Sequence, residues 1–257
     1  MTRILACSDI HSNVNAVRQL RAREGNDYDA LIVAGDVGSD AADKIFDILR
    51  TFDCPVLYVF GNWDSRLKHD RDFGDRCHHL HLSPYPVGDL AIVGETIDGI
   101  DREWEAVIKA MRADPARVAI ARQEYMDRQR AKLSEIVAAQ SPVRTVVVSH
   151  YRLTKTQTFL PGVPLFLFGH IHGFEDKNHR GQRFVNVIAL DKKVMVTRKG
   201  LRRAAPGDFR FLNDGSYVVI SHDASAGFAI EPRRFDPDFS DWERVKGIFH
   251  SSATEVK

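Results

Sequence analysis

The chain of 257 residues is 44% hydrophobic and carries 36 basic and 35 acidic side chains, for a formal net charge of +1. A chain of this length suits a single α/β domain with a full hydrophobic core. The near-neutral charge provides no global field for steering onto nucleic acid or an anionic membrane, and the 28% charged fraction with 9% aromatic residues is globular rather than disordered.

The cysteines and the N-terminal residues indicate the cellular compartment of the protein. Cys7, Cys54 and Cys77 are too few and too scattered for a disulfide framework, which favours a reducing environment. The N-terminal residues turn polar at Ser8 before a signal-peptide apolar stretch could develop. No run approaches the ~18 apolar residues of a membrane span. We therefore expect a cytoplasmic protein with no membrane partner.

The first third of the chain alternates apolar runs with helical patterns. Short runs at 4–7, 30–34 and 56–60 predict buried strands, and residues 13–23 and 41–50 have the apolar spacing of helices. This alternation is typical of βαβ units and a parallel sheet.

After residue 64 the pattern is less regular. Residues 65–88 look like a loop that leads into a strand at 90–93, and the pattern from 101 to 140 predicts two helices broken near Asp114-Pro115. The residues after Pro232 are polar, so we expect a domain over 1–231 and a peripheral tail over 232–257. Further strands are expected at 144–149, 164–168, 184–189, 217–221 and 227–231.

Metal-binding residue types follow five of the expected strands. Because the carboxyl ends of parallel strands converge on one crevice, these groups should meet at one sheet edge. Two carboxylates, one amide oxygen and four imidazoles are too many for one tetrahedral zinc and suit two divalent cations. Each segment alone is as well explained by a capped turn, and the interpretation depends on all five occurring in order. The residues are Asp9, His11, Asp36, Asn62, His150, His170 and His172.

The ordered motifs Asp-x-His, Gly-Asp, Gly-Asn, Ser-His and Gly-His-x-His resemble the calcineurin-like metallophosphoesterase superfamily over residues 9–172. The resemblance implies a four-layer α/β/β/α sandwich, with two mixed sheets flanked by helices. It implies a first metal bound by Asp9, His11 and His172. It also implies a second metal bound by Asn62, His150 and His170, with Asp36 bridging both.

A bridging carboxylate also follows from the charges. Two cations ~3.5–4 Å apart repel each other strongly unless an anion lies between them. We hypothesise that a hydroxide bridging the metals attacks phosphorus in line, with Asp36, Asn62 and His150 as catalytic residues. Mixed nitrogen and oxygen ligands favour Mn²⁺, with Fe, Zn²⁺ or Ni²⁺ as alternatives. Imidazoles must be neutral to bind metal, so metal loss and falling activity are expected below about pH 6.

One position departs from the family pattern, which usually has a histidine where this chain has Trp63. That histidine is thought to stabilise the transition state or to protonate the leaving group, and an indole has no titratable proton. Either another residue supplies the proton, or the substrate has a good leaving group. We expect a small phosphoester, a diester in preference to a monoester, with nucleotides among the candidates. The alternative proton donors are His69, His78, His79 and His81.

Asn13, Trp63 and Arg66 are the predicted substrate contacts, although Asn13 can equally cap the first helix. The basic stretch 192–203 has no interleaved aromatic residues, so nucleic-acid binding is not expected. Two alternatives stay open. One is a non-catalytic scaffold resembling the retromer subunit of this fold, and the other is a nuclease-like activity on nucleic-acid ends. The sequence makes no prediction of oligomeric state.

Overall fold

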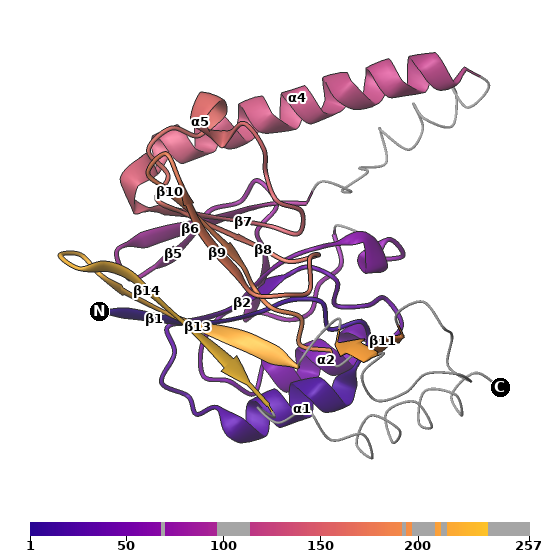
Figure 1. Cartoon of the computed structure of the whole chain (residues 1–257), viewed down its shortest axis with the longest axis vertical. Coiled ribbons are helices and arrows are strands. Elements are labelled where there is room, and N and C mark those ends of the chain that lie inside the picture. The colour runs from indigo at the N-terminus through magenta and orange to yellow at the C-terminus, as the bar shows by residue number, and fades with distance from the viewer. Residues whose placement is uncertain (68–69, 97–113, 192–193, 197–208, 212–214, 236–257) are drawn as a thin grey trace.

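Two six-stranded sheets dominate the computed structural model, which describes residues 1–67, 70–96, 114–191, 194–196, 209–211 and 215–235 (Figure 1). The first sheet has the order β14-β13-β1-β2-β3-β4, with β1 to β4 parallel and β13 antiparallel to β1. Its strands are β1 (Thr2–Cys7), β2 (Ala30–Ala34), β3 (Val56–Val59), β4 (Cys77–His79), β13 (Ser216–Asp223) and β14 (Gly227–Arg234).

The second sheet has the order β5-β6-β7-β8-β10-β9, and its four central strands are parallel. Its strands are β5 (Tyr85–Val87), β6 (Leu90–Glu95), β7 (Thr145–Ser149), β8 (Leu165–Phe168), β9 (Glu175–His179) and β10 (Gln182–Asn186). A separate hairpin pairs β11 (Val194–Val196) with β12 (Phe209–Phe211). The helices are α1 (Val14–Arg23), α2 (Ala42–Leu49), α4 (Pro115–Ala139) and α5 (Thr156–Phe159), with 3₁₀ turns η1 (Asn62–Asp64) and η2 (Pro142–Arg144).

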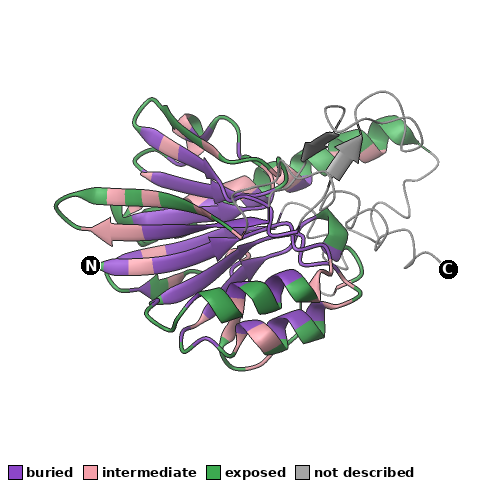
Figure 2. Ribbon diagram, turned by 60° about the horizontal axis from the view of Figure 1, so that its bottom comes forward, coloured by how far each residue is buried: buried purple, intermediate pink, exposed green. Residues whose placement is uncertain are grey.

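The side-chain alternation of the strands builds the layers. Along β1, Leu5 faces α1 and α2, whereas Ile4 belongs to the apolar layer shared with the second sheet. A third apolar cluster lies between the second sheet and α4, where Leu133 packs with Val147. Figure 2 shows the buried strands, with helices whose outer faces are exposed. The predicted four-layer sandwich of two mixed sheets and flanking helices is therefore confirmed.

The helices and strands predicted from the sequence match those of the structure well where the strands are apolar, and less well elsewhere. The strand at 30–34 matches β2, and α4 begins at Pro115 with its N-cap at Asp114, as the predicted break requires. The first of the two helices predicted over 101–140 falls outside the described residues. The prediction of a loop over 65–88 is wrong in part, because that range contains β4 and β5.

The C-terminal part differs in its boundaries. The strand expected at 184–189 lies at 182–186 as β10, and β14 continues to Arg234, three residues beyond the expected domain boundary. The rest of the predicted tail, from 236 onward, and nearly all of the basic stretch 192–203 lie outside the described residues. Within the described part of the chain, no helix has the length and apolarity needed to cross a membrane.

Candidate metal centre

The loops that follow the parallel strands meet at one edge of the sandwich. The loop after β1 is tied to the loop after β2, since the backbone N–H groups of Ile10 and His11 both donate to the carbonyl of Asp36, at 2.8 and 3.0 Å. The two sheets are joined at the same edge. The N–H of His170, after β8, donates to Asp9 Oδ2 at 3.0 Å. The topology thus brings together segments that are 161 residues apart in sequence.

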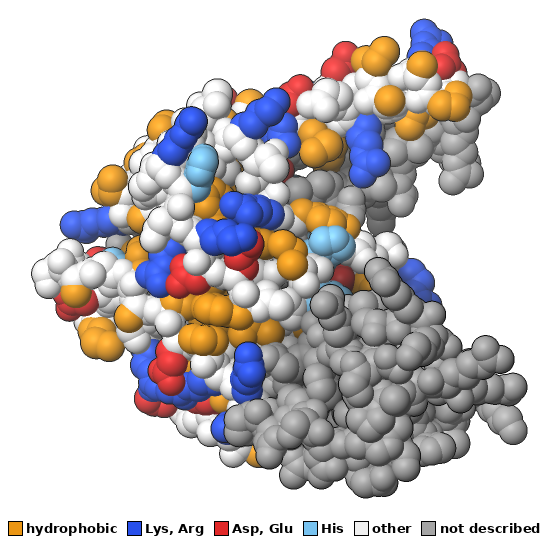
Figure 3. Space-filling model, in the orientation of Figure 1, with side chains coloured by type: hydrophobic (Ala, Val, Ile, Leu, Met, Phe, Trp, Pro, Cys, Tyr) orange, Lys and Arg blue, Asp and Glu red, His pale blue; other side chains and the backbone are white. Residues whose placement is uncertain are grey.

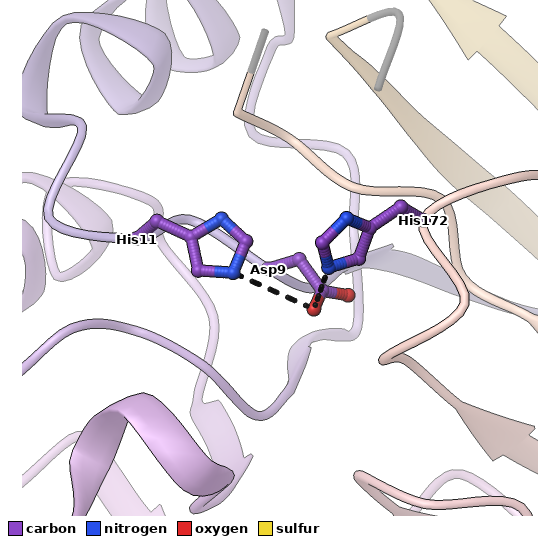
Figure 4. Close-up of side chains that lie close together, drawn as sticks. All are labelled: Asp9, His11 and His172. Carbon is purple, nitrogen blue, oxygen red and sulfur yellow. Dashed lines mark ion pairs between the residues drawn. The ribbon is translucent and has the colours of Figure 1, made fainter. Parts of the chain in front are cut away.

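Asp9 lies at the centre of the first group of potential ligands. Its Oδ1 is 3.1 Å from Nε2 of His172 and 3.8 Å from Nε2 of His11, and both rings point toward this oxygen from opposite sides (Figure 4). The other oxygen, Oδ2, accepts hydrogen bonds from Ser8 Oγ at 2.6 Å and from the His170 backbone. These two donors fix the carboxylate so that Oδ1 faces the imidazoles.

Asp36 lies between the first group and a second histidine. Its Oδ2 is 3.4 Å from Nε2 of His11 and 3.3 Å from Nε2 of His150, while Oδ1 accepts a hydrogen bond from the Trp63 N–H at 2.8 Å. Burial alone would raise the pKa of Asp36, but the adjacent imidazoles of His11 and His150, whose Nε2 atoms face its Oδ2, hold that pKa well below its ordinary value. The carboxylate is therefore ionised and offers one oxygen to both sides of the site.

His150 and Asn62 form the other side. The Nδ1 of His150 is 3.0 Å from the Ala34 carbonyl, so this nitrogen carries the proton and Nε2 is left as an acceptor. That Nε2 lies 3.1 Å from Asn62 Oδ1, and the same oxygen accepts a hydrogen bond from the Tyr151 hydroxyl at 3.0 Å. Burial opposes protonation of His150, yet the hydrogen bond and charge of Asp36 raise its pKa. The ring of His170 lies 5.2 Å from that of His150.

The backbone at this edge is strained. Asp9, His11, Asp36, His170 and His172 all have φ between 50° and 68°, in the left-handed region that non-glycine residues adopt infrequently, Asp, Asn and His more often than the others. They make up half of the ten non-glycine residues with positive φ in the described ranges. Strain of this kind costs of order 1–3 kcal/mol per residue and concentrates at functional sites. The fold holds these side chains in place at a cost in stability.

Asp64 and Gly61 support the loops that carry the ligands. The Asp64 carboxylate accepts hydrogen bonds from the N–H groups of Gly38 at 2.7 Å and Gly61 at 2.9 Å, so it ties the loop after β2 to the loop after β3. Burial raises the pKa of Asp64 to about 6 despite these bonds. A Cβ on Gly61 would lie 2.3 Å from Asp36 Oδ1, so only glycine allows the close approach.

The donor set fits divalent cations. Two groups of described residues place one ligand atom each within 4.8 Å of one another, namely Asp9 with His11 and His172, and Asp9 with Asp36 and His150. Within the described residues, Asp9 Oδ1 is buried and accepts no hydrogen bond. A buried anionic oxygen that faces imidazole nitrogens is a suitable site for a cation between them.

Sequence reasoning missed Asp191. Its Oδ2 lies 3.3 Å from Nδ1 of His11, its Oδ1 accepts a hydrogen bond from Asn13 Nδ2 at 2.8 Å, and its N–H donates to the Asp9 carbonyl at 3.1 Å. The residue follows β10 and the apolar residues after it. The rule that predicted the other ligands, a polar residue after a parallel strand, finds Asp191 only if the apolar residues 187–190 are read as part of the preceding strand.

The chain matches the model of the calcineurin-like phosphoesterase superfamily domain over residues 2–229. This chain belongs to that superfamily. No curated protein matches the chain. Several solved structures are similar, and two are a predicted phosphoesterase of Streptococcus pneumoniae and the phosphopantetheinyl hydrolase of Mycobacterium tuberculosis. The first is 14% identical, with 91% of this chain and 90% of that chain covered and a TM-score of 0.45. The second is 20% identical, with 82% and 95% covered and a TM-score of 0.46.

A third similar structure is Vps29 from Chaetomium thermophilum, which is 12% identical, with 91% of this chain and 97% of that chain covered and a TM-score of 0.42. Likenesses as distant as these three carry no argument about activity. For this calcineurin-like phosphoesterase domain, assignment of the seven ligands to two metals therefore remains a prediction. The geometry brings Asp9, His11 and His172 together, and Asp36 with His150 and Asn62.

The three residues predicted to contact the substrate lie in different surroundings. Asn13 is the N-cap of α1, with Oδ1 accepting from the Ala16 N–H at 3.0 Å, as the capping alternative expects. Trp63 is 50% exposed, and its ring centroid lies 4.6 Å from that of His11. Arg66 is exposed and forms an ion pair with Asp40.

The histidines weighed as alternative proton donors have structural contacts. His79 Nε2 lies 3.1 Å from Thr96 Oγ1, and His81 Nδ1 accepts a hydrogen bond from the Thr96 N–H at 3.0 Å. The ring centroid of His78 lies 4.4 Å from that of Tyr85. His69 lies outside the described residues. These contacts account for three of the four histidines without a catalytic role.

Proposed function

We propose that this protein is a dinuclear metal-dependent phosphoesterase that prefers phosphodiesters to monoesters. One observation carries the proposal. At the edge where the two sheets meet, the imidazoles of His11 and His150 lie 3.3 to 3.8 Å from the buried carboxylate oxygens of Asp9 and Asp36. Two buried carboxylates that face imidazole nitrogens favour a functional site over a purely structural one.

The residues divide into two ligand groups around Asp36. Asp9, His11 and His172 would hold one ion, and Asn62, His150 and His170 the other, with Asp36 Oδ2 between a histidine of each group. Mn²⁺ is the expected ion, with Fe, Zn²⁺ and Ni²⁺ as alternatives. When bound, two such ions neutralise the charge of a phosphoryl group and lower the pKa of water to the range where it becomes a nucleophile.

The chain's own contribution is to orient the ligands before substrate arrives. The Ala34 carbonyl accepts a hydrogen bond from Nδ1 of His150, and Asp191 faces Nδ1 of His11, so in both rings Nε2 is directed inward. Hydrogen bonds from Ser8 and the His170 backbone fix Asp9 in the same way. Five of the seven predicted ligands also lie at positive-φ backbone positions, which the surrounding structure must hold in place.

The preference for diesters follows from Trp63 and its surroundings. The indole can donate one hydrogen bond but has no proton to give to a departing alkoxide, so it favours esters with good leaving groups. Trp63, Ile171 and Phe174 are 50%, 54% and 41% exposed, and all three lie in the loops that carry the ligands. Exposed apolar side chains in these loops suit a leaving group with an aromatic or aliphatic body.

Metal analysis and hydrolysis of bis-p-nitrophenyl phosphate test the proposal. Protein loaded with Mn²⁺ should hold two ions per chain and should turn over the diester faster than p-nitrophenyl phosphate. Asp36→Asn should reduce turnover at least ~10³-fold, because the bridging charge is lost. Asp47→Asn is the matched control, since Asp47 lies exposed on α2 and pairs only with Arg50 in the described residues. Fewer than two bound ions together with no turnover would identify a scaffold.

A further inference from the structure

The two predicted groups of metal ligands differ in how far the protein encloses them. In the first group, Asp9 and His11 are buried. In the second group His150 is buried, but Asn62 and His170 are exposed. Figure 3 shows histidine side chains, in pale blue, that reach the surface of the molecule. An exposed side chain loses rotamer freedom when it binds a metal ion, so the second group depends more on neighbours that hold its ligands in place.

Tyr151 follows His150 directly in the loop after β7 and contacts all three side chains of the second group. Its hydroxyl donates to Asn62 Oδ1 at 3.0 Å. Its ring centroid lies 4.4 Å from that of His170 and 5.1 Å from that of His150. The Ser149 hydroxyl donates to the Tyr151 carbonyl at 2.7 Å and so fixes the backbone from which the tyrosine extends. One half-buried side chain thus spans the whole of the second group.

The tyrosine hydroxyl determines which end of the Asn62 amide faces the site. An asparagine amide has an acceptor oxygen at one end and an NH₂ donor at the other, and only the oxygen suits a cation. Oδ1 lies 3.1 Å from Nε2 of His150 while it accepts the hydrogen bond from Tyr151. Because an amide oxygen has two lone pairs, it can accept this bond and still bind a metal. The hydroxyl therefore keeps the oxygen on the side of His150.

The tyrosine ring limits the orientation of His170. The His150 imidazole is held from behind by a hydrogen bond to the Ala34 carbonyl. Among the residues that the structure describes, the His170 imidazole makes no hydrogen bond. It packs instead against the ring of Tyr151, at an interplanar angle of 54°. Tilted ring pairs at this separation are favourable, so the contact takes the place of a hydrogen-bond partner behind the imidazole.

We propose that Tyr151 is a positioning residue for the second metal ion, acting through Asn62 and His170. This inference rests on the proposed function, since it needs an ion at the second group of ligands. Each contact described above lies within that group, so removal of Tyr151 should weaken binding of the second ion and leave the first ion in place. Loss of a partner behind a metal ligand usually lowers metal affinity about 10–100-fold.

Titration of the metal-free protein with Mn²⁺, followed by calorimetry and electron paramagnetic resonance, tests the proposal. The wild type should bind two ions and should then show the spectrum of a magnetically coupled pair. Tyr151→Phe keeps the ring and loses the hydroxyl, so it should bind the second ion at least ~10-fold more weakly. At Mn²⁺ concentrations that fill both sites of the wild type, this variant should show the spectrum of an isolated bound ion. Its unchanged affinity for the first ion shows that it is folded.

Two further variants show whether the hydroxyl acts through Asn62. Tyr85→Phe is the matched control, because Tyr85 is also half-buried and, within the described residues, its ring pairs with His78 and with no predicted ligand. It should bind both ions as the wild type does. Asn62→Ala/Tyr151→Phe should bind the second ion no more weakly than Asn62→Ala alone, because the hydroxyl then has no amide oxygen to orient.

The outcomes separate the two proposals. If the wild type never holds a second ion, the proposed function fails. If the wild type holds two ions and Tyr151→Phe binds both with the same affinities, the positioning role is overturned and the phosphoesterase assignment stands. Equal weakening of both ions in Tyr151→Phe would indicate a general structural role and would also overturn it. Additive losses in the double variant would do the same, because the hydroxyl would then not act through Asn62.

Discussion

Asp191 holds the outer nitrogen of His11, with Oδ2 of the carboxylate 3.3 Å from Nδ1, while Nε2 of the same ring lies 3.4 Å from Asp36. The side chain of His11 is almost fully buried, so the ring has no solvent to replace this contact. A carboxylate on the far nitrogen fixes the tautomer and the ring plane and makes the inner nitrogen a better ligand. Asp191 is therefore a positioning residue.

Asp191→Ala should lower metal affinity about 10–100-fold, the usual effect of removing a partner behind a ligating histidine. Metal titration followed by calorimetry measures it, and thermal unfolding of the metal-free variant separates lost affinity from lost stability. Asp191→Asn retains one acceptor oxygen and should lie between the wild type and Asp191→Ala. Equal metal affinity in all three proteins would remove Asp191 from this role.

Gly61→Ala should damage the site while leaving the fold intact. The new Cβ would lie 2.3 Å from Asp36 Oδ1 and 2.7 Å from His150 Cδ2, so both side chains must shift. We expect about 1–3 kcal/mol of destabilisation from the added group and loss of the second metal. Gly173→Ala is the control, because a Cβ there meets nothing within 4 Å. Metal content and melting temperature are measured for both, and a Gly61→Ala protein with two tightly bound ions would contradict the packing argument.

The sequence was sufficient to predict the central strands and most of the site. Strands such as β2 are continuous apolar runs because both faces are buried, and the polar residue after each run marks the sheet edge where ligands meet. That rule located Asp9, Asp36 and His150 without knowledge of the pairing. Periodicity along a buried strand therefore carries information about the site as well as the fold.

Three of the four edge strands of the two large sheets could not be predicted in the same way. β4, β5 and β9 all lie at sheet edges, and β9 consists of exposed or half-exposed polar residues. An edge strand is stabilised by hydrogen bonds to its single neighbour, so its sequence needs no apolar run. The partner of His11 was missed for a related reason. The apolar residues continue past the end of β10 to Leu190, so the strand end that precedes Asp191 is not marked in the sequence.

Glu95 should make stability fall as pH rises. Burial raises the pKa of this carboxyl from 4.5 to about 7, an effect that Arg130 only partly offsets, and within the described residues its Oε2 has no hydrogen-bond partner. The folded protein then binds more protons than the unfolded chain between these two values. The contribution of the neutral carboxyl to the free energy of unfolding is therefore fully present below pH 4.5 and is lost as the pH rises through about 7. The loss amounts to up to ~3 kcal/mol.

Denaturant unfolding at a series of pH values measures this loss. Glu95→Gln cannot ionise, so its free energy of unfolding relative to the wild type should increase steadily between pH 5 and 7 and then level off. The comparison between the two proteins cancels the titration of other carboxyls. A difference that stays constant with pH would show that Glu95 titrates at an ordinary value.

Trp63→His should extend the reaction to esters with poor leaving groups. Trp63 is half exposed beside His11, so an imidazole can be placed there without rebuilding the core. A general acid contributes typically ~10²–10⁴-fold when the leaving group needs a proton and little when it does not. We expect kcat/KM for phenyl phosphate to rise at least ~10-fold. This is less than the full effect of a general acid, because no neighbouring side chain orients the new imidazole. The value for p-nitrophenyl phosphate should change much less. Trp63→Phe keeps the aromatic ring without a proton and serves as the control. An equal rise for both esters, or a rise in Trp63→Phe as well, would show that the effect comes from removing the indole and that the added acid is not its cause.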